Sequence, residues 1–62
     1  MPKYVVINYY TGEKVATFDT DADLVRAVFN NNEFWFPMEI RNLVEDRRIS
    51  QKELMELKEG LK

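Results

Sequence analysis

Four consecutive residues near the middle of the chain, Phe34-Trp35-Phe36-Pro37, constrain the fold more than any other stretch. Each aromatic ring can bury roughly 150–250 Å², so these side chains are expected at the centre of the core or of a binding surface. In an extended segment, Phe34 and Phe36 face one side and Trp35 faces the other. Two interpretations of Trp35 follow: burial in the structure, which we expect, or a role as an exposed anchor for a partner.

The chain is short, with 62 residues, and it contains neither cysteine nor histidine. A chain of this size buries only about 60% of its unfolded surface, so an active-site cleft is difficult to build. The two missing residue types exclude disulfides, Cys-His and Ser-His-Asp nucleophilic sites and the usual transition-metal sites. We therefore expect one α+β domain over residues 1–62, with no enzymatic activity and no cofactor or metal.

Nine basic and eleven acidic side chains give the chain a net charge of −2. Proteins that bind nucleic acid usually carry a basic excess on at least one face, which argues against DNA as a partner. No apolar run approaches the roughly 18 residues of a membrane-spanning helix, and the N-terminus lacks the pattern of a signal peptide. We expect a cytoplasmic protein that does not bind membranes.

Two segments rich in β-branched and aromatic residues, 3–10 and 13–18, flank Thr11-Gly12 and predict a β-hairpin. A two-residue loop would force Thr11 to positive φ, which a β-branched residue resists. A turn on Tyr10-Thr11 with Gly12 as a left-handed bulge fits better. One predicted face carries Tyr4, Val6, Ala16 and Phe18, and the other carries Val5, Ile7, Tyr9 and Val15. Because both faces are apolar, we expect a packed element on each, and we expect self-association.

The stretch Thr20-Asp21-Ala22-Asp23 has a capping-box pattern, with two carboxylates in the first turn of a helix where the dipole favours them. The apolar residues of this helix fall on one arc: Ala22, Leu24, Val25, Val28 and Phe29. We predict an amphipathic helix that begins at Thr20, ends in the run Asn30-Asn31-Asn32 and packs on the hairpin.

Pro37 can occupy the first position of a second helix, with Arg47-Arg48 in its last turn. The apolar arc of this helix contains Ile40, Leu43 and Val44, and helical spacing places Arg47 among them. Two interpretations of Arg47 are open. Its methylenes can cover the apolar edge while the guanidinium stays in water, or it can anchor a contact surface.

Ser50 and Glu53 form a second capping box, and Ile49 and Leu54 form the hydrophobic staple that often accompanies one. These residues predict a third helix from Gln51 to about Glu59 that stops at Gly60. Its apolar stripe is narrow and consists of Leu54, Leu57 and Leu61. A helix this short is marginal in isolation, so it must dock on its own chain or on another.

The predicted fold class is therefore α+β, and no internal repeat is evident in the sequence. The expected order is an N-terminal β-hairpin, an amphipathic helix, the aromatic segment as a possible third strand, and two C-terminal helices.

The stretch from Ile40 to Leu54, which ends in Ser-Gln-Lys-Glu-Leu, resembles the opening two helices of repressor-type helix-turn-helix domains. The resemblance implies a DNA-binding regulator in which Arg47, Arg48 and Lys52 contact phosphates. That family continues through a glycine turn into a recognition helix, whereas this sequence runs from Met55 to Gly60 and ends two residues later. We predict no specific DNA binding.

The function that we expect is a small protein-binding regulator or inhibitor, of the type that phages encode, which occupies a surface of a larger partner. The alternatives are the helix-turn-helix regulator and a structural subunit whose apolar surfaces serve self-assembly into a homo-oligomer. The candidate partner-binding residues are Trp35, Arg47, Tyr9, Tyr10, Arg48 and Leu57.

Overall fold

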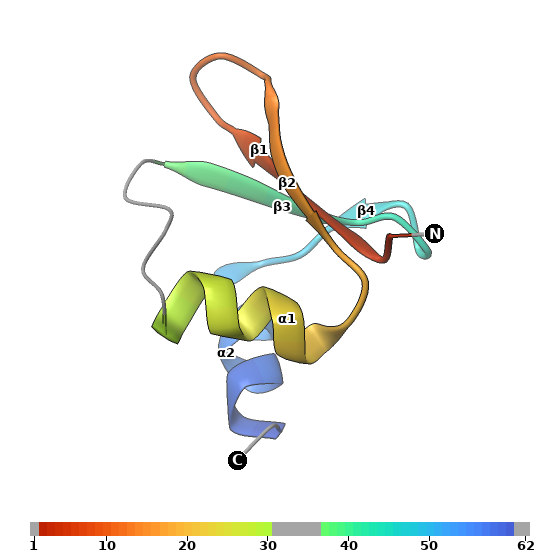
Figure 1. Ribbon diagram of the computed structural model, residues 1–62, viewed down its shortest axis with the longest axis vertical. Helices are drawn as coiled ribbons and strands as arrows, with labels where there is room; N and C mark the ends of the chain where they lie inside the picture. Colours follow the sequence, from red (N-terminus) through yellow and green to blue (C-terminus); the bar gives the residue numbers. More distant parts are fainter. Residues whose placement is uncertain (1, 31–36, 61–62) are drawn as a thin grey trace.

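The computed structural model of this chain describes residues 2–30 and 37–60. Within these ranges the fold is mixed α+β, with a four-stranded antiparallel sheet in the order β2-β1-β3-β4. The strands are β1 (Tyr4–Asn8), β2 (Lys14–Phe18), β3 (Met38–Asn42) and β4 (Arg47–Arg48). The helices are α1 (Asp21–Val25), which continues as the π-helical segment η1 (Arg26–Asn30), and α2 (Gln51–Gly60). Both helices lie on the same side of the sheet (Figure 1).

The pairing of β1 with β2 confirms the predicted hairpin. Tyr4 lies opposite Phe18 and Val6 lies opposite Ala16. These four side chains share one face, as the alternation of the sequence predicted. That face is the one toward which the helices pack, since Tyr4 and Val6 belong to the buried core.

The turn of this hairpin depends on Gly12, which has a φ of 77°. This is the left-handed conformation that glycine adopts without steric cost, as predicted. The Gly12 N–H donates a hydrogen bond of 2.8 Å to the Asn8 carbonyl, so the loop spans residues 9–12. The prediction was wrong in one detail, because the bulge lies in the strands, between Val6 and Ile7, rather than at the turn.

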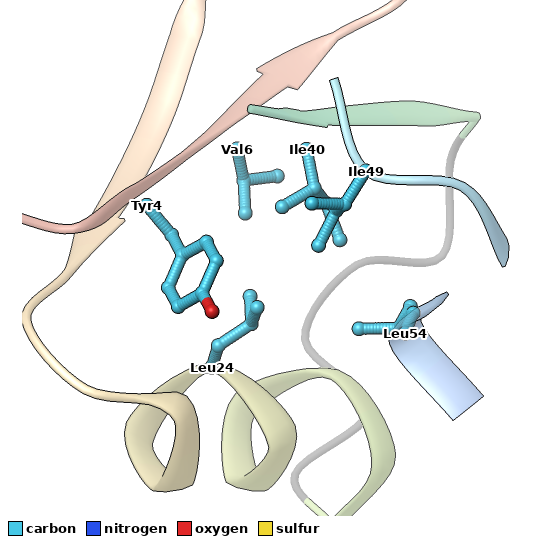
Figure 2. Close-up of a cluster of buried hydrophobic side chains, with 6 residues drawn as sticks. All are labelled: Tyr4, Val6, Leu24, Ile40, Ile49 and Leu54. Carbon is cyan, nitrogen blue, oxygen red and sulfur yellow. The ribbon is translucent and has the colours of Figure 1, made fainter. Parts of the chain in front are cut away.

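The core is formed where the two helices meet one face of the sheet. Its buried side chains come from β1, β3, both helices and the residue after β4: Tyr4, Val6, Leu24, Ile40, Ile49 and Leu54 (Figure 2). Leu24 and Val6 have no exposed surface. The predicted staple of Ile49 with Leu54 is therefore part of the central core, and it fixes the start of α2 to the sheet.

The predicted helix over residues 37–48 is wrong, because this region forms β3, a turn and β4. Ile40 lies opposite Val6 in the sheet and is buried, whereas Leu43 and Val44 are exposed in the turn. The Asn42 side chain accepts hydrogen bonds from the N–H groups of Val44 and Glu45. Such side-chain bonds compete with the helical pattern, and β3 forms its backbone hydrogen bonds with β1 on one side and with β4 on the other.

The resemblance to helix-turn-helix domains is not matched by the structure. In the stretch from Ile40 to Leu54, only the residues from Gln51 onward are helical. The first helix of such a domain is replaced by the β3–β4 hairpin, so this stretch does not form the pair of packed helices that the resemblance implies.

The face of the sheet opposite the helices carries no helix in the described part of the chain. Val5 on this face is nevertheless only 2% exposed, between its cross-strand partners Thr17 and Arg41. The methylenes of an arginine can cover an apolar neighbour while the guanidinium stays in water. The expectation of a packed element on each face is therefore met on one face only among the described residues. The segment Phe34-Trp35-Phe36, a possible third strand, lies outside the described residues, and the third strand that is observed begins at Met38.

The described residues form two similar units, each consisting of a β-hairpin followed by a helix. The first unit is β1-β2-α1 and the second is β3-β4-α2. The inner strands β1 and β3 pair antiparallel with Val6 opposite Ile40 at the centre, and β2 and β4 lie outside them. The sheet order and the placement of both helices on one side are those of an approximate two-fold repeat (Figure 1).

The local structure of the two units also agrees. Thr20 and Ser50 each precede a helix and accept a hydrogen bond from the N–H three residues later, that of Asp23 and that of Glu53. The residue that follows in each helix is a leucine, Leu24 or Leu54, and both leucines are in the core. Few other equivalent positions of the two units carry the same residue type, which explains why the repeat is not evident in the sequence.

Candidate functional site

A groove of about 570 Å³ opens between β3, the end of η1 and the start of α2. Its lining is mixed, with apolar and polar side chains. The lining residues are Tyr9, Val28, Phe29, Met38, Glu39, Ile40, Arg48, Ile49, Ser50, Gln51, Leu54 and Met55. The buried residues among them form an apolar floor of core side chains, and the exposed ones form a rim that includes an aromatic, a sulfur-containing and a cationic side chain.

The groove exists because β4 is short. β4 pairs with β3 only through Arg41 with Arg48 and Asn42 with Arg47. One more backbone hydrogen bond joins the Ile49 N–H to the Ile40 carbonyl at 2.9 Å, and the chain then turns into α2. In the first unit, by contrast, β2 continues alongside β1 as far as Phe18. The part of β3 near Met38 therefore has no strand beside it on the β4 side among the described residues.

The rim of the groove carries one ion pair, between the Arg48 guanidinium and the Glu39 carboxylate. Their nearest atoms, Nη1 and Oε1, are 3.6 Å apart. The Arg48 side chain is 65% exposed and that of Glu39 is 25% exposed. An exposed pair at this distance contributes little to stability, so the Arg48 guanidinium is available to a partner. The opposite wall includes Phe29, with the Lys58 ammonium 4.7 Å from its ring centre.

Arg47, in contrast to Arg48, is used within the chain. Its guanidinium donates two hydrogen bonds to Glu53 in α2, of 2.6 and 2.7 Å, and one of 3.1 Å to Glu45. Hydrogen bonds to Glu53 and Glu45 raise the pKa of Arg47, and the same contact lowers the pKa of Glu53. Arg47 therefore neither covers the apolar edge of a helix nor stays free to anchor a partner. It forms a clamp that joins β4 to α2 through its hydrogen bonds with Glu53. In the capping box, the Ser50 hydroxyl accepts a hydrogen bond from the Glu53 N–H, while the Glu53 carboxylate binds Arg47.

A second polar cluster lies in the first unit, where β1 meets the start of α1. The Tyr4 hydroxyl donates a hydrogen bond of 2.5 Å to Asp21 Oδ1, and the Lys3 ammonium donates one of 3.0 Å to the same oxygen. The hydrogen bonds from Tyr4 and Lys3 lower the pKa of Asp21. Burial, reinforced by the contact with Asp21, raises the pKa of Tyr4. This cluster fixes the Tyr4 ring beneath α1.

The structure separates the candidate residues that the sequence suggested. Tyr9 and Arg48 lie together on the groove. Tyr10 stacks edge-to-face on Tyr9, with ring centres 6.5 Å apart, but it does not line the groove. Leu57 is half-buried against the core, and Trp35 lies outside the described residues. The groove residues that sequence reasoning missed include Met38, Gln51 and Met55, which line it because β4 stops early.

Other kinds of site are not found in the ranges 2–30 and 37–60. No group of three or more acidic residues there could hold a metal ion. Every buried side-chain nitrogen or oxygen in these ranges has a hydrogen-bond partner. No described helix is long and apolar enough to cross a membrane.

Comparison with known proteins assigns no family. The chain matches no protein-family model, and it has no significant match among the curated proteins or the solved structures. The function has to be inferred from the groove and from the residues around it.

Proposed function

We propose that this chain is a small, non-enzymatic protein-binding module that regulates a larger partner by occupying part of its surface. The observation that carries the proposal is the groove, which combines a floor of core side chains with an exposed rim. Tyr9, Arg48 and Met55 reach that rim from three different elements. Aromatic residues, methionine and arginine are the types enriched at protein interfaces, and methionine adapts to varied apolar partners.

The lining also supports binding rather than catalysis. Glu39 is the only carboxylate among the described lining residues, and it is paired with Arg48. General acid–base chemistry usually requires two titratable groups, or one with a shifted pKa, facing a shared cleft. A groove with one paired carboxylate and an apolar floor is better suited to hold side chains of another protein.

Quantitative affinity capture from the source cells tests the proposal with two matched pairs of variants. Tyr9→Ala and Met55→Glu change the groove, whereas Tyr10→Ala and Val44→Glu change exposed residues that do not line it. We expect the two groove variants to lose a partner that wild type and both controls retain at a fixed ratio. Capture that is the same for all five proteins would reject the groove as the binding surface.

Self-association is a second candidate function, favoured by the two hairpin loops. The loop of the first unit exposes Tyr9 and Tyr10, and the loop of the second exposes Leu43 and Val44. Such pairs can bury apolar surface between copies of the chain. Sedimentation equilibrium at micromolar concentration distinguishes this candidate: a single 7.4 kDa species up to roughly 100 µM contradicts it.

A further inference from the structure

The groove in the second unit corresponds to a place that is filled in the first unit. Asn8 ends β1 and Asn42 ends β3, so Met38 at the start of β3 is the counterpart of Tyr4 at the start of β1. Thr20 and Ser50 precede the two helices, so Gln51 is the counterpart of Asp21. Asn8 and Thr20 are separated by 12 positions, but Asn42 and Ser50 by only 8, and the difference accounts for the short β4.

Two rings fill this place in the first unit. Tyr4 is 2% exposed, with its hydroxyl bound to Asp21, and Phe18 of β2 lies opposite it in the sheet. In the second unit, an unbranched Met38 replaces the tyrosine and an exposed Gln51 replaces the aspartate. No residue of β4 lies opposite Met38. The groove is thus the space that a ring and a strand occupy in the first unit.

Among the residues that the structure describes, no strand lies beside β3 at the same place on the β4 side. The Tyr9 N–H bonds to the Pro37 carbonyl and the Leu43 N–H to the Lys3 carbonyl, so odd-numbered residues of this strand point their backbone groups toward β1. Met38 and Ile40 therefore point theirs toward the groove. The Ile40 carbonyl accepts a bond from Ile49, and the described strand pairing of β4 does not extend to Met38. An extended segment can add to such an edge through main-chain hydrogen bonds.

The positive charge of Arg48 at the rim favours a segment that carries an acidic residue. The Arg48 guanidinium is 65% exposed and contacts Glu39 only at 3.6 Å. Side chains alternate along an extended segment. Of the two neighbours of the residue that enters the groove, the one that lies beside Glu39, and not the one beside Pro37, would face the same side of the sheet as Arg48 and lie near it. A carboxylate at that position complements the guanidinium, with which it can form a charge-assisted pair.

We propose, building on the protein-binding function, that the groove takes an extended segment of a partner protein that carries an aromatic residue next to an acidic one. The aromatic ring enters the space between Met38 and Leu54. The corresponding space in the first unit holds the rings of Tyr4 and Phe18. The main chain of the segment pairs with β3 at Met38, and the carboxylate meets Arg48. The partner thereby supplies the length that β4 lacks.

The chain itself provides the probe that tests this occupant. Residues 13–19, Glu-Lys-Val-Ala-Thr-Phe-Asp, contain β2 and place a phenylalanine next to an aspartate. The blocked peptide of this sequence is titrated into the isotope-labelled full chain, and amide shifts are followed by NMR. We expect saturable shifts at Met38, Glu39 and Leu54. A peptide with alanine in place of phenylalanine should bind more than tenfold more weakly, because the buried ring is lost. A peptide with asparagine in place of aspartate should bind several-fold more weakly at low salt.

Two variants of the full chain complete the test. Met38→Tyr places a ring equivalent to that of Tyr4 into the groove and should abolish binding of the peptide. Met55→Glu, at a rim residue that is 41% exposed and outside the core, should weaken it without affecting the fold. Absence of saturable shifts, or equal binding of the alanine peptide, would overturn the proposed occupant.

The outcomes also separate this inference from the proposed function. Loss of partner capture by Tyr9→Ala, combined with no binding of the peptide, would reject the extended aromatic segment and leave the protein-binding function standing. A dimer in sedimentation that the peptide converts to monomer would identify a second copy of the chain as the occupant, and this result too would overturn the proposal.

Discussion

Asn8 and Asn42 make the same pair of hydrogen bonds in two different hairpins. The Asn8 Oδ1 accepts the N–H groups of Tyr10 and Thr11 at 2.9 and 3.3 Å. The Asn42 Oδ1 accepts those of the residues two and three positions later at 2.9 and 3.0 Å. Each asparagine ends an inner strand and closes a four-residue loop, so the two residues mark equivalent positions in the two units.

The two asparagines differ in burial, which predicts unequal effects of their replacement. Asn42 is 2% exposed, and its Nδ2 also donates to Glu45 at 2.9 Å. Asn42→Ala removes the side chain that accepts two part-buried hydrogen bonds and donates a third, and we expect it to lower the free energy of unfolding by roughly 1–3 kcal/mol. Asn8→Ala should cost less, because its loop is exposed. Urea unfolding of both variants checks the order, and an equal loss would contradict it.

The fourth residue after each of the two asparagines has a left-handed backbone conformation, but only one of the two is glycine. Gly12 has a φ of 77° and Asp46 has a φ of 53°. A non-glycine residue in this conformation costs roughly 1 kcal/mol. Asp46→Gly should therefore raise the free energy of unfolding by up to about 1 kcal/mol, less the flexibility that glycine adds to the unfolded chain. Gly12→Ala should lower it by a similar amount. Thermal unfolding measures both, and destabilisation by Asp46→Gly would mean that its ion pair with Arg41 outweighs the strain.

The pH dependence of stability follows from two carboxylates with lowered pKa values, Asp21 and Glu53. A carboxyl group with a lowered folded-state pKa contributes stability above its unfolded pKa, near 4, and loses it as the pH falls through the folded value. The free energy of unfolding should therefore decline below about pH 4. Asp21→Asn should make this decline shallower, whereas Asp46→Asn, at a 92% exposed side chain, serves as the control. A decline that is unchanged in Asp21→Asn would contradict the role of the Tyr4–Asp21 contact.

The same linkage has the opposite sign for Tyr4 at high pH. Burial raises the pKa of its hydroxyl in the folded state. A raised value contributes stability below the unfolded pKa, near 10, and loses it as the pH rises through the folded value. We expect stability to fall above about pH 10, and Tyr4→Phe should reduce this alkaline decline. An alkaline decline of the same steepness in Tyr4→Phe would show that other groups cause it.

The relation between the two units predicts that the second can be converted toward the first. Met38→Tyr with Gln51→Asp recreates the ring and carboxylate of the Tyr4–Asp21 contact at the groove. Burying the added ring surface should stabilise the chain by about 1–2 kcal/mol, since the groove of about 570 Å³ can hold it. Urea unfolding provides the measurement, with Met38→Tyr alone as the matched control. Destabilisation of both proteins would indicate overpacking and would contradict the equivalence of Met38 and Tyr4.

Local features of the fold were predictable from the sequence because short-range chemistry determines them. Gly12, Thr20 and Ser50 have the conformations or hydrogen bonds that their residue types favour. The region 37–48 was not predictable in this way. The spacing of Ile40, Leu43 and Val44 fits a helix, but pairing of β3 with β1 overrides it, and only Ile40 is buried.

The groove was only partly predictable, for a related reason. Tyr9 and Arg48 could be named as candidates because exposed aromatic and arginine side chains are common in contact surfaces. Met38, Gln51 and Met55 could not, because they become neighbours only when β4 ends after two residues. The length of β4 depends on the local cap of α2 at Ser50 and also on the clamp between Arg47 and Glu53, which is a contact between two elements.

Site-specific photocrosslinking in the source cells tests most directly whether the groove is the binding surface. A photoreactive phenylalanine analogue is placed at Met55 on the rim of the groove or, as the matched control, at Val44 in the loop of the second unit. Both side chains are exposed, at 41% and 74%, so both tolerate the replacement. We expect one crosslinked partner from position 55, which Tyr9→Ala removes, and none from position 44. Crosslinking of the same partner from position 44 with none from position 55 would contradict it.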